Sequence, residues 1–476
     1  MFTLLTTGPS ARWILACLSS SMLLSSIGTS IANVSLPTLA QAFDASFQQV
    51  QWVVIGYLVA ITTVIVSVGR LGDMTGRRRL LLIGIALFTL ASVLCGVSST
   101  LEFLIVARAA QGLGAAMMMT LIMAFVGETV SKATIGKAMG LLGTMSAIGT
   151  ALGPSLGGIL IAEFGWRAIF LINLPLGLMI YLLAHRYLPA DSQRETTDRA
   201  GFDLIGSLVF AVTLAAYTLG MTIRRGSFGP LNTALLAAAL MGAGLFIVAE
   251  GRAVSPLVSL GMFRNALLSA SLAMSTLVST VMMATLVVGP FYLSRALGLH
   301  AGLIGLVLSV GPFCAALASV PAGRLADRHG AQRMTLVGLT GIAAGAVLLS
   351  VIPVTLGIFG YVLPLIVLTA GYALFQTANN TAVMAAIASD QRGIVSGLLN
   401  LSRNLGLITG ASAMGAVFAA ASAAADITTA PADAIAHGMR VTFAVAATLI
   451  AVAIAIAMAT DCRTLRGCEA VPATKS

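Results

Sequence analysis

Two arginines lie inside long apolar stretches of the sequence, where a charged side chain is costly. Arg108 is about two helical turns into the stretch 102–125, and Arg403 is about nine residues, or about 14 Å of helix, into the stretch 394–420. A buried guanidinium attracts anions, pairs with backbone carbonyls or extends along its stem to the helix end. Arg108 and Arg403 are therefore the candidates for chemistry that depends on charge, and backbone pairing stays open for both.

Carboxylates and imidazoles, the usual proton-handling groups, are missing from the middle of these stretches. Glu102, Glu128 and Glu163 lie at stretch ends, and the histidines lie in loops or at boundaries. The sequence has no Gly-x-x-x-x-Gly-Lys-Ser/Thr loop for nucleotide phosphates and no spaced cluster of His, Cys and acid for a metal. A nucleophile beside a buried base is missing too. The sequence therefore predicts neither an enzyme nor a bound cofactor or metal.

Membrane-spanning helices must position the two arginines, because the chain is too apolar for a soluble fold. Its mean hydropathy is +1.00, and 9% of its 476 residues are charged, unlike the composition of a soluble domain. Fourteen apolar segments are long enough to cross a bilayer. They cover residues 12–36, 50–69, 80–98, 102–125, 136–162, 167–188, 203–222, 231–249, 267–294, 302–321, 333–352, 356–382, 394–420 and 439–460. A polar connector, Pro189 to Gly201, follows the sixth segment.

The basic residues are distributed unevenly between the two sides of this topology. An even number of segments puts both termini on one side, and the loops of that side, including 70–79, 132–137 and 186–199, hold most of the Lys and Arg residues. The positive-inside rule makes that side cytoplasmic. The net charge of +10 therefore needs no nucleic acid as a partner. We expect the first segment to be retained, because no cleavage site is evident before Pro37.

The first six and the last six segments repeat each other. The stretch after segment 2 reads GRLGDMTGRRR, from Gly69 to Arg79, and the stretch after segment 10 reads GRLADRHGAQR, from Gly323 to Arg333. Matching glycines also recur in segments 5 and 13. Segments 1 to 6 and 9 to 14 are therefore two parallel copies of one unit, with segments 7 and 8 inserted between them.

A seam of small residues with one proline lies in segment 5. Gly149, Gly153 and Gly157 are four residues apart, so they share one face of a helix and let a neighbouring backbone approach closely. Pro154 is tolerated in a membrane helix, where neighbours satisfy the carbonyl that it frees. A general packing seam and a moving gate both fit this pattern. The matching residues of segment 13 are Gly406, Gly410, Ala411 and Met414.

Together these motifs resemble those of the major facilitator superfamily, and the fourteen segments resemble its branch of drug:proton antiporters with two extra central helices. Further matching stretches are Asn33 to Pro37, Arg108 to Gly112 and Trp166 to Gly177. The resemblance implies an all-α integral membrane protein with the major facilitator fold, in which two six-helix bundles and two inserted central helices make 14 transmembrane helices. The expected domains are 1–188 (six helices), 189–266 (connector and inserted helices), 267–460 (six helices) and a cytoplasmic tail, 461–476.

The resemblance also implies that the loop between segments 2 and 3 gates the cytoplasmic side. We expect Asp73 to cap the helix that follows, Gly69 and Gly76 to allow a tight turn, and Arg77 with its neighbours to hold the interface or meet lipid phosphates. The glycine and proline seam resembles the family's antiporter motif and is expected to seal the outward path. The expected gating residues are Gly69, Asp73, Gly76, Arg77, Gly149, Gly153, Pro154, Gly157, Gly323 and Asp327.

The family's motif arginine, at the position of Arg108, is implied to take part in proton transfer, and Arg403 is the second coupling candidate. The branch commonly has an aspartate five residues before the first residue of Asn33 to Pro37, where this chain has Gly28. A cavity without a buried carboxylate has little to neutralise a dication, whereas Arg108 and Arg403 favour a neutral or anionic compound.

The sequence and the resemblance predict a secondary active transporter of a bacterial inner membrane, which exports drugs or other small lipophilic compounds in exchange for protons by alternating access. Polar and adaptable side chains are expected to line its cavity. They are Thr29, Asn33, Gln111, Met117, Tyr292, Tyr372, Gln376 and Asn379. A facilitator or uptake symporter of a small metabolite on the same fold and a non-transporting membrane receptor are the alternatives. No feature indicates the oligomeric state.

Overall fold

Helices form the described part of the chain, and no strand occurs in that part. The computed structural model describes residues 9–45, 47–130, 134–189, 203–222, 229–253, 256, 258–299, 301–388, 391–422 and 431–469. Contacts divide the chain into two units. One comprises Met1–Leu260 and Met384–Leu401, and the other comprises Gly261–Val383 and Ser402–Ser476. The expected all-α fold is confirmed.

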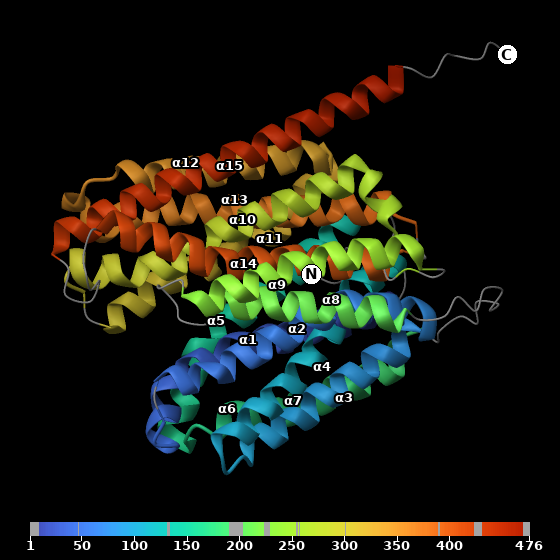
Figure 1. Ribbon diagram of the computed structural model, residues 1–476, viewed down its shortest axis with the longest axis horizontal. Coiled ribbons are helices and arrows are strands. Elements are labelled where there is room, and N and C mark those ends of the chain that lie inside the picture. Colours follow the sequence, from blue (N-terminus) through green and yellow to red (C-terminus); the bar gives the residue numbers. More distant parts are fainter. Residues whose placement is uncertain are drawn as a thin grey trace. The chain divides into compact units, whose positions relative to one another are not determined.

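The first unit contains nine helices of the described chain and the beginning of α14 (Figure 1). Their bounds are α1 Pro9–Ala42, α2 Phe47–Thr75, α3 Arg77–Gly96, α4 Leu101–Thr129, α5 Ile135–Phe164, α6 Ala168–Leu171, α7 Asn173–Tyr187, α8 Leu204–Thr222, α9 Pro230–Arg252 and α14 Arg392–Ser422. Helix α1 packs against α5, and α4 packs against both α2 and α3. Helix α7 lies along α3. Helix α4, which carries Arg108, therefore lies against α2, which carries Asp73, and the glycine seam of α5 lies against α1.

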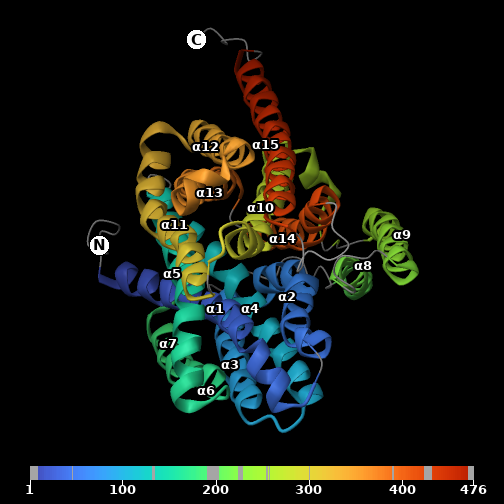
Figure 2. The same ribbon diagram turned by 90° about the vertical axis from the view of Figure 1, so that its left-hand side faces the viewer.

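The second unit contains the remaining helices and the rest of α14. Their bounds are α10 Ala266–Phe291, a π-helical turn Tyr292–Ala296, α11 Ala301–His329, α12 Ala331–Val351, α13 Gly357–Ala386 and α15 Ala432–Glu469. Helix α15 runs beside α12, as both views show (Figures 1 and 2), and it also packs against α10. Aromatic side chains such as Tyr361, Phe375 and Phe443 fill the apolar core between these helices.

Thirteen helical spans of the described residues are long and apolar enough to cross a membrane. The remaining predicted segment, 203–222, corresponds to α8, whose apolar part, Ile205–Met221, is shorter than those spans. Helices α8 and α9 lie side by side as an antiparallel pair (Figure 2). The rings of Phe210 and Phe246 join them, with their centroids 4.7 Å apart. Their outer side chains are strongly exposed, as in Leu240 and Met241 of α9. Because such exposure is stable in lipid rather than in water, the pair is part of the membrane fold.

Two prolines explain where the structure interrupts predicted segments. Segment 167–188 is divided between α6 and α7, because Pro175 has no N–H to donate to the carbonyl of Leu171, where α6 ends. Segment 267–294 is a regular helix only to Phe291, and a π-helical turn follows Pro290. The predicted positions of both segments are otherwise close to the observed helices.

Candidate substrate and gating sites

Arg108 of α4 is fully buried and is the centre of a polar cluster in the first unit. Its Nε donates a hydrogen bond to the carbonyl of Val53 on α2 at 3.1 Å, and its Nη1 donates to the carbonyl of Gly28 on α1 at 3.2 Å. Nη1 also donates to Oε1 of Gln111 at 2.5 Å. The guanidinium therefore joins three helices, because α1, α2 and α4 each supply an acceptor.

Aromatic rings enclose the same guanidinium. Its Cζ lies 4.2 Å from the centroid of the Tyr57 ring and 5.8 Å from that of Phe170, within the range of cation–π attraction. The hydroxyls of Tyr57 and Thr29 are 3.1 Å apart, which connects Thr29 to the cluster. The structure thus brings Arg108, Thr29 and Gln111 together as predicted site residues. Tyr57 and Phe170 also belong to the cluster but are not among the predicted site residues, although a tyrosine among the apolar residues of segment 2 is a signal for such a role.

No carboxylate of the described residues pairs with Arg108. Its partners are carbonyls, an amide and aromatic rings, and its Nη2 is buried with no hydrogen-bond partner in the described part of the chain. An arginine side chain keeps its proton in proteins. The cluster therefore holds a fixed positive charge that its described neighbours leave uncompensated, and such a charge attracts anions and repels cations in a medium of low dielectric constant.

Gly28, which stands where the resembling antiporters commonly have an aspartate, has no room for a side chain. A β-carbon on Gly28 would lie 2.6 Å from Cζ of Phe88 on α3, closer than a normal contact. Phe88 is itself fully buried, so it has little freedom to turn aside. The ring of Phe88 occupies the space beside Gly28, and a carboxylate at this position would require the ring to move.

Asp73 lies in the last turn of α2 and contacts both Arg77 and the start of α14. Its Oδ1 accepts hydrogen bonds from Nε and Nη2 of Arg77 at 3.0 and 2.7 Å, and the two side chains are 5% and 6% exposed. Its Oδ2 accepts a hydrogen bond from the backbone N–H of Ile394 at 3.3 Å. The expectation that Asp73 caps α3 is wrong, since α3 begins without a side-chain cap. Asp73 instead complements the start of α14, where backbone N–H groups lack partners within the helix.

Gly69 is not part of a turn, contrary to expectation, because α2 continues to Thr75. A β-carbon on Gly69 would overlap the backbone of Gly393, so the glycine allows α2 and the start of α14 to approach closely. Gly76 is the turn residue, with a φ of 103° that favours glycine. Its equivalent in the repeat, Gly330, has a φ of 89°, so both units make the same turn.

The residues that match Gly69 and Asp73 in the repeat also lie inside a helix rather than in a turn. Gly323 and Asp327 lie inside α11, which continues to His329, so Gly323 is not a turn residue either.

In the first unit, two further polar contacts attach the start of α14 to α4. Nη1 of Arg392 donates a hydrogen bond to the carbonyl of Gly127, and Oγ of Ser396 donates to the carbonyl of Thr120 at 2.6 Å. The sequence gives no local signal for these contacts, because both acceptors are backbone atoms.

Gly149, Gly153 and Gly157 lie on the face of α5 that packs against α1. A β-carbon on Gly149 would lie 2.7 Å from Cβ of Ser26, and β-carbons on Gly153 and Gly157 would also be too close to atoms of α1. Gly158, on another face, has no such neighbour within 4 Å. The close approach that the spacing predicts is therefore present, and its partner is α1.

A hydroxyl crosses this interface, and its equivalent occurs in the second unit. Oγ of Ser30 on α1 donates a hydrogen bond to the carbonyl of Gly149 on α5 at 3.2 Å. Oγ1 of Thr280 on α10 donates to the carbonyl of Gly406 on α14 at 3.1 Å. Because Gly406 matches Gly149 in the repeat, both units join their first and fifth helices by the same bond.

Comparison with known proteins identifies the family. A family model of the Major Facilitator Superfamily matches residues 18–411 and 271–461. The chain belongs to this family. The multidrug resistance protein Stp of Mycobacterium tuberculosis is 33% identical to it over 403 residues, which are 82% of this chain and 72% of Stp. The riboflavin transporter RibZ of Clostridioides difficile is 29% identical over 409 residues, which are 86% of this chain and 88% of RibZ.

Solved structures of other major facilitators have the same fold. The human organic anion transporter MFSD10 has a TM-score of 0.68 and 15% identity, with 94% of this chain and 100% of that chain covered. The proton:xylose symporter XylE has a TM-score of 0.68 and 14% identity, with coverage of 94% and 95%. This major facilitator is therefore a multi-pass membrane transporter with bacterial relatives, and its family and relatives are transporters rather than enzymes.

The other predicted cavity residues of this major facilitator do not lie together as Arg108, Thr29 and Gln111 do. Met117 of α4 packs against α3, since a β-carbon on Gly84 would lie 2.6 Å from its Cβ. In the second unit, Nδ2 of Asn379 donates a hydrogen bond to the carbonyl of Ser271 at 3.4 Å. Gln376 donates to a neighbour in its own helix, Oδ1 of Asn380, also at 3.4 Å. These contacts place the residues within helix packing, and a cavity role for them stays a prediction.

The second unit of this transporter also holds two predicted aromatic residues and Arg403. The rings of Tyr292 and Tyr361 are stacked with their centroids 5.9 Å apart, and Tyr372 packs against the apolar core. Arg403 is half-buried, and its Nε has no hydrogen-bond partner among the described residues. The side chains of Asn33 and Pro154 lie outside the described residues, as do the connector residues 190–202.

Proposed function

We propose that this major facilitator exports drugs or other small lipophilic compounds in exchange for protons by alternating access, and that it favours neutral or anionic compounds over dications. The observation that carries the substrate preference is the buried Arg108, whose hydrogen-bond partners among the described residues are uncharged. An uncompensated positive charge repels a dication over several ångströms in a low-dielectric surrounding. The multidrug resistance protein Stp, 33% identical, supports drugs as the substrate class.

The gate in this proposal is the contact of Asp73 with Arg77 and with the start of α14. The carboxylate satisfies a backbone N–H in the first turn of α14 and the positive end of that helix at once. Motion of α14 away from α2 must break this bond and leave the buried Arg77 beside a carboxylate that has lost one partner. That cost makes the contact suited to holding one state of an alternating-access cycle, with the cytoplasmic side as the side that it gates.

The seam of α5 is the second moving element of the proposal. Its glycines bring α5 and α1 into backbone contact, and tight packing of this kind excludes water and substrate between the two helices. We assign to this interface the sealing of the outward path, with both chain termini on the cytoplasmic side of a bacterial inner membrane.

Reconstitution into proteoliposomes with an imposed pH gradient tests the proposal. Neutral, anionic and dicationic fluorescent compounds of similar size are added in turn, and compound movement and internal pH are recorded together. We expect transport of the neutral and anionic compounds with a matched proton flux. Transport without proton flux would contradict antiport. Strong export of a quaternary ammonium dication that persists after Glu102, Glu128 and Glu163 are all changed to Gln would contradict the charge preference.

Transport of a small metabolite is the second candidate, because the relative RibZ, named as a riboflavin transporter, is 29% identical over most of both chains. The same proteoliposomes distinguish the two functions by direction. Uptake of riboflavin along the proton gradient, with no movement of the drug panel, would favour this candidate over export.

A further inference from the structure

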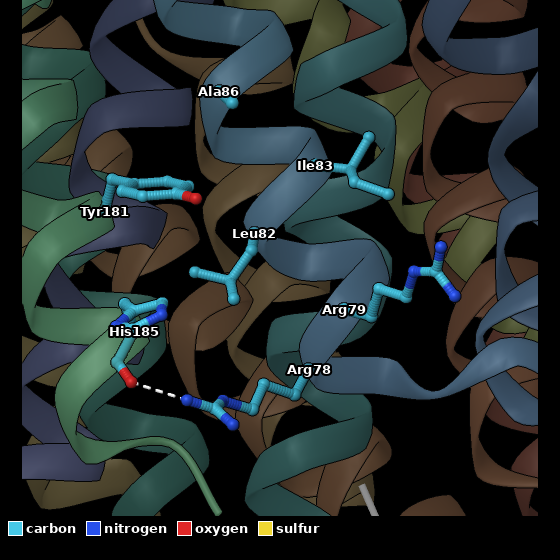
Figure 3. A pocket seen from close by; sticks show the side chains of 7 residues that line it. All are labelled: Arg78, Arg79, Leu82, Ile83, Ala86, Tyr181 and His185. Atoms are coloured by element: carbon cyan, nitrogen blue, oxygen red, sulfur yellow. Dashed lines mark hydrogen bonds between the residues drawn. The ribbon is translucent and has the colours of Figure 1, made fainter. Parts of the chain in front are cut away.

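Helices α3 and α7 enclose a groove that none of the sites above uses. Its volume is about 480 Å³, and it is lined by Arg78, Arg79, Leu82, Ile83 and Ala86 of α3 and by Tyr181 and His185 of α7. We call it the α3–α7 groove. Figure 3 shows Arg78 extending from α3 towards the end of α7, Tyr181 and His185 on neighbouring turns of α7, and Leu82 between the helices.

One end of the α3–α7 groove is strongly basic. Arg78 and Arg79 are in the first turn of α3, where the helix dipole adds positive charge. Nη2 of Arg78 donates a hydrogen bond to the carbonyl of His185 at 2.5 Å, so its charge is held in one position at the mouth of the groove. None of the seven lining residues is acidic. The three consecutive arginines have different contacts. Arg77 pairs with Asp73, whereas Arg78 and Arg79 line the groove.

The other end of the groove is apolar. Leu82 and Ala86 form its floor on successive turns of α3, about 12 Å of helix from Arg78 to Ala86. Further along, the helices close on each other, since a β-carbon on Gly177 of α7 would overlap Thr89 of α3. The groove is thus open at its basic end and narrows along an apolar floor, which matches the order of chemical groups in a phospholipid.

The position of the groove matches the membrane surface. The membrane-spanning stretches Arg77–Gly96 and Ala168–Tyr187 begin and end, respectively, beside its basic end, which puts that end at the level of lipid head groups. Exposed apolar side chains such as Leu90 and Leu182 continue along the same two helices and face lipid. Arg78 and Arg79 extend to opposite sides of α3 (Figure 3). A guanidinium at this level is suited to a phosphate, with which arginine forms charge-assisted bonds.

We propose that the α3–α7 groove binds an anionic phospholipid, with the phosphate at the basic end against Arg78, Arg79 adding positive charge from the other side of α3, the Tyr181 hydroxyl and His185 at the head group, and an acyl chain over Leu82 and Ala86. Basic pockets between transmembrane helices bind such head groups. The chemistry favours an anionic over a zwitterionic lipid, because two positive charges and no lining carboxylate meet the head group. The site is separate from the substrate cluster around Arg108.

Native mass spectrometry of the purified, delipidated full-length protein tests this assignment. The protein is incubated with phosphatidylglycerol or with phosphatidylcholine of the same acyl chains, and the fraction carrying one bound lipid is measured. We expect preferential retention of phosphatidylglycerol, and about a tenfold loss of that adduct in the variant Arg78→Gln/Arg79→Gln, as for the loss of one or two charge-assisted bonds. Arg79→Gln alone leaves the Arg78–His185 bond in place and serves if the double variant does not fold.

Two controls make the result specific to the groove. Arg333→Gln removes the arginine of α12 that matches Arg79 in the repeat, and it should leave the adduct unchanged. Ala86→Phe fills the apolar floor and should also lower lipid retention. In a separate measurement, phosphatidylglycerol should raise the melting temperature of the wild type, and inorganic phosphate alone should not. Equal loss in Arg333→Gln, an unchanged adduct in both groove variants, or stabilisation by phosphate alone would overturn the proposal.

Discussion

The carboxylate of Asp73 accepts a hydrogen bond from the backbone N–H of Ile394 at 3.3 Å, across 321 positions of the sequence. Its other oxygen holds Arg77. One side chain at the end of α2 thus fixes both its own turn and the first turn of α14. Every residue except proline supplies the N–H at position 394, so other substitutions there cannot test the bond, and Asp73 is the position that can.

Asp73→Asn should destabilise the protein by about 3 kcal/mol, since removing one partner of a buried ion pair leaves the other charge uncompensated. Thermal unfolding in detergent measures the change, and transport assays should show a loss of activity. The double variant Asp73→Asn/Arg77→Gln should cost less than the sum of the two single variants. Additive effects would show that the two side chains do not act as a pair.

Gly153→Leu should abolish export, because its β-carbon would overlap Ser30 and force α5 away from α1. Overpacking of this kind costs about 1–3 kcal/mol. The matched control is Gly158→Leu on the same helix, which has no neighbour within 4 Å and should retain normal export. Normal export by Gly153→Leu would show that the seam is not part of the gate.

Arg108→Gln should reduce transport of anionic compounds by about tenfold or more, the effect expected for a lost charge-assisted interaction, and should reduce transport of neutral compounds less. Arg108→Lys keeps the charge but cannot reach the carbonyls of Val53 and Gly28 and the Gln111 amide together, so it should restore activity only in part. Transport rates for paired anionic and neutral dyes measure the ratio. An equal fall for both dyes in both variants would indicate a purely structural arginine.

Gly28→Asp should be poorly tolerated, because Phe88 fills the space that a side chain would need. Combining it with Phe88→Ala should relieve the overlap, so the double variant should be more stable than the two single effects predict. The new carboxylate would lie near Arg108 and neutralise it, and we expect transport of a dicationic dye to appear. A double variant that folds but transports only neutral and anionic dyes would show that a carboxylate at position 28 does not determine which substrate charge is transported.

The sequence predicts the helices well because length and apolarity alone identify a membrane span. The predicted segment 80–98, for example, corresponds to α3 at Arg77–Gly96. The ends are less accurate, since they depend on single residues such as Gly76 and Pro175 that decide where a helix can stop. The turn residue Gly76 is recognisable, but nothing in its neighbourhood shows that α2 extends past Gly69.

The sequence predicts only those components of the candidate sites that are side chains. Arg108, Gln111 and the glycines of α5 stand out by residue type and spacing. The acceptors of Arg108 at Val53 and Gly28, and the donor to Asp73 at Ile394, are backbone groups, which almost any residue type provides. Long-range pairing with backbone atoms has no sequence signal, so it comes from the structure alone.

Gly149, Gly153 and Gly157 leave α5 without protruding side chains where it faces α1. Helices that interlock through ridges and grooves have a single register, because a ridge must leave its groove before the helix can slip. A face of glycines has no ridge, and a slip of about 6 Å brings the next glycine, four residues on, to the place of the previous one. The seam therefore presents fewer side-chain obstacles to lengthwise sliding than interlocking ridges would, and the bond from Ser30 to the carbonyl of Gly149 holds the observed register.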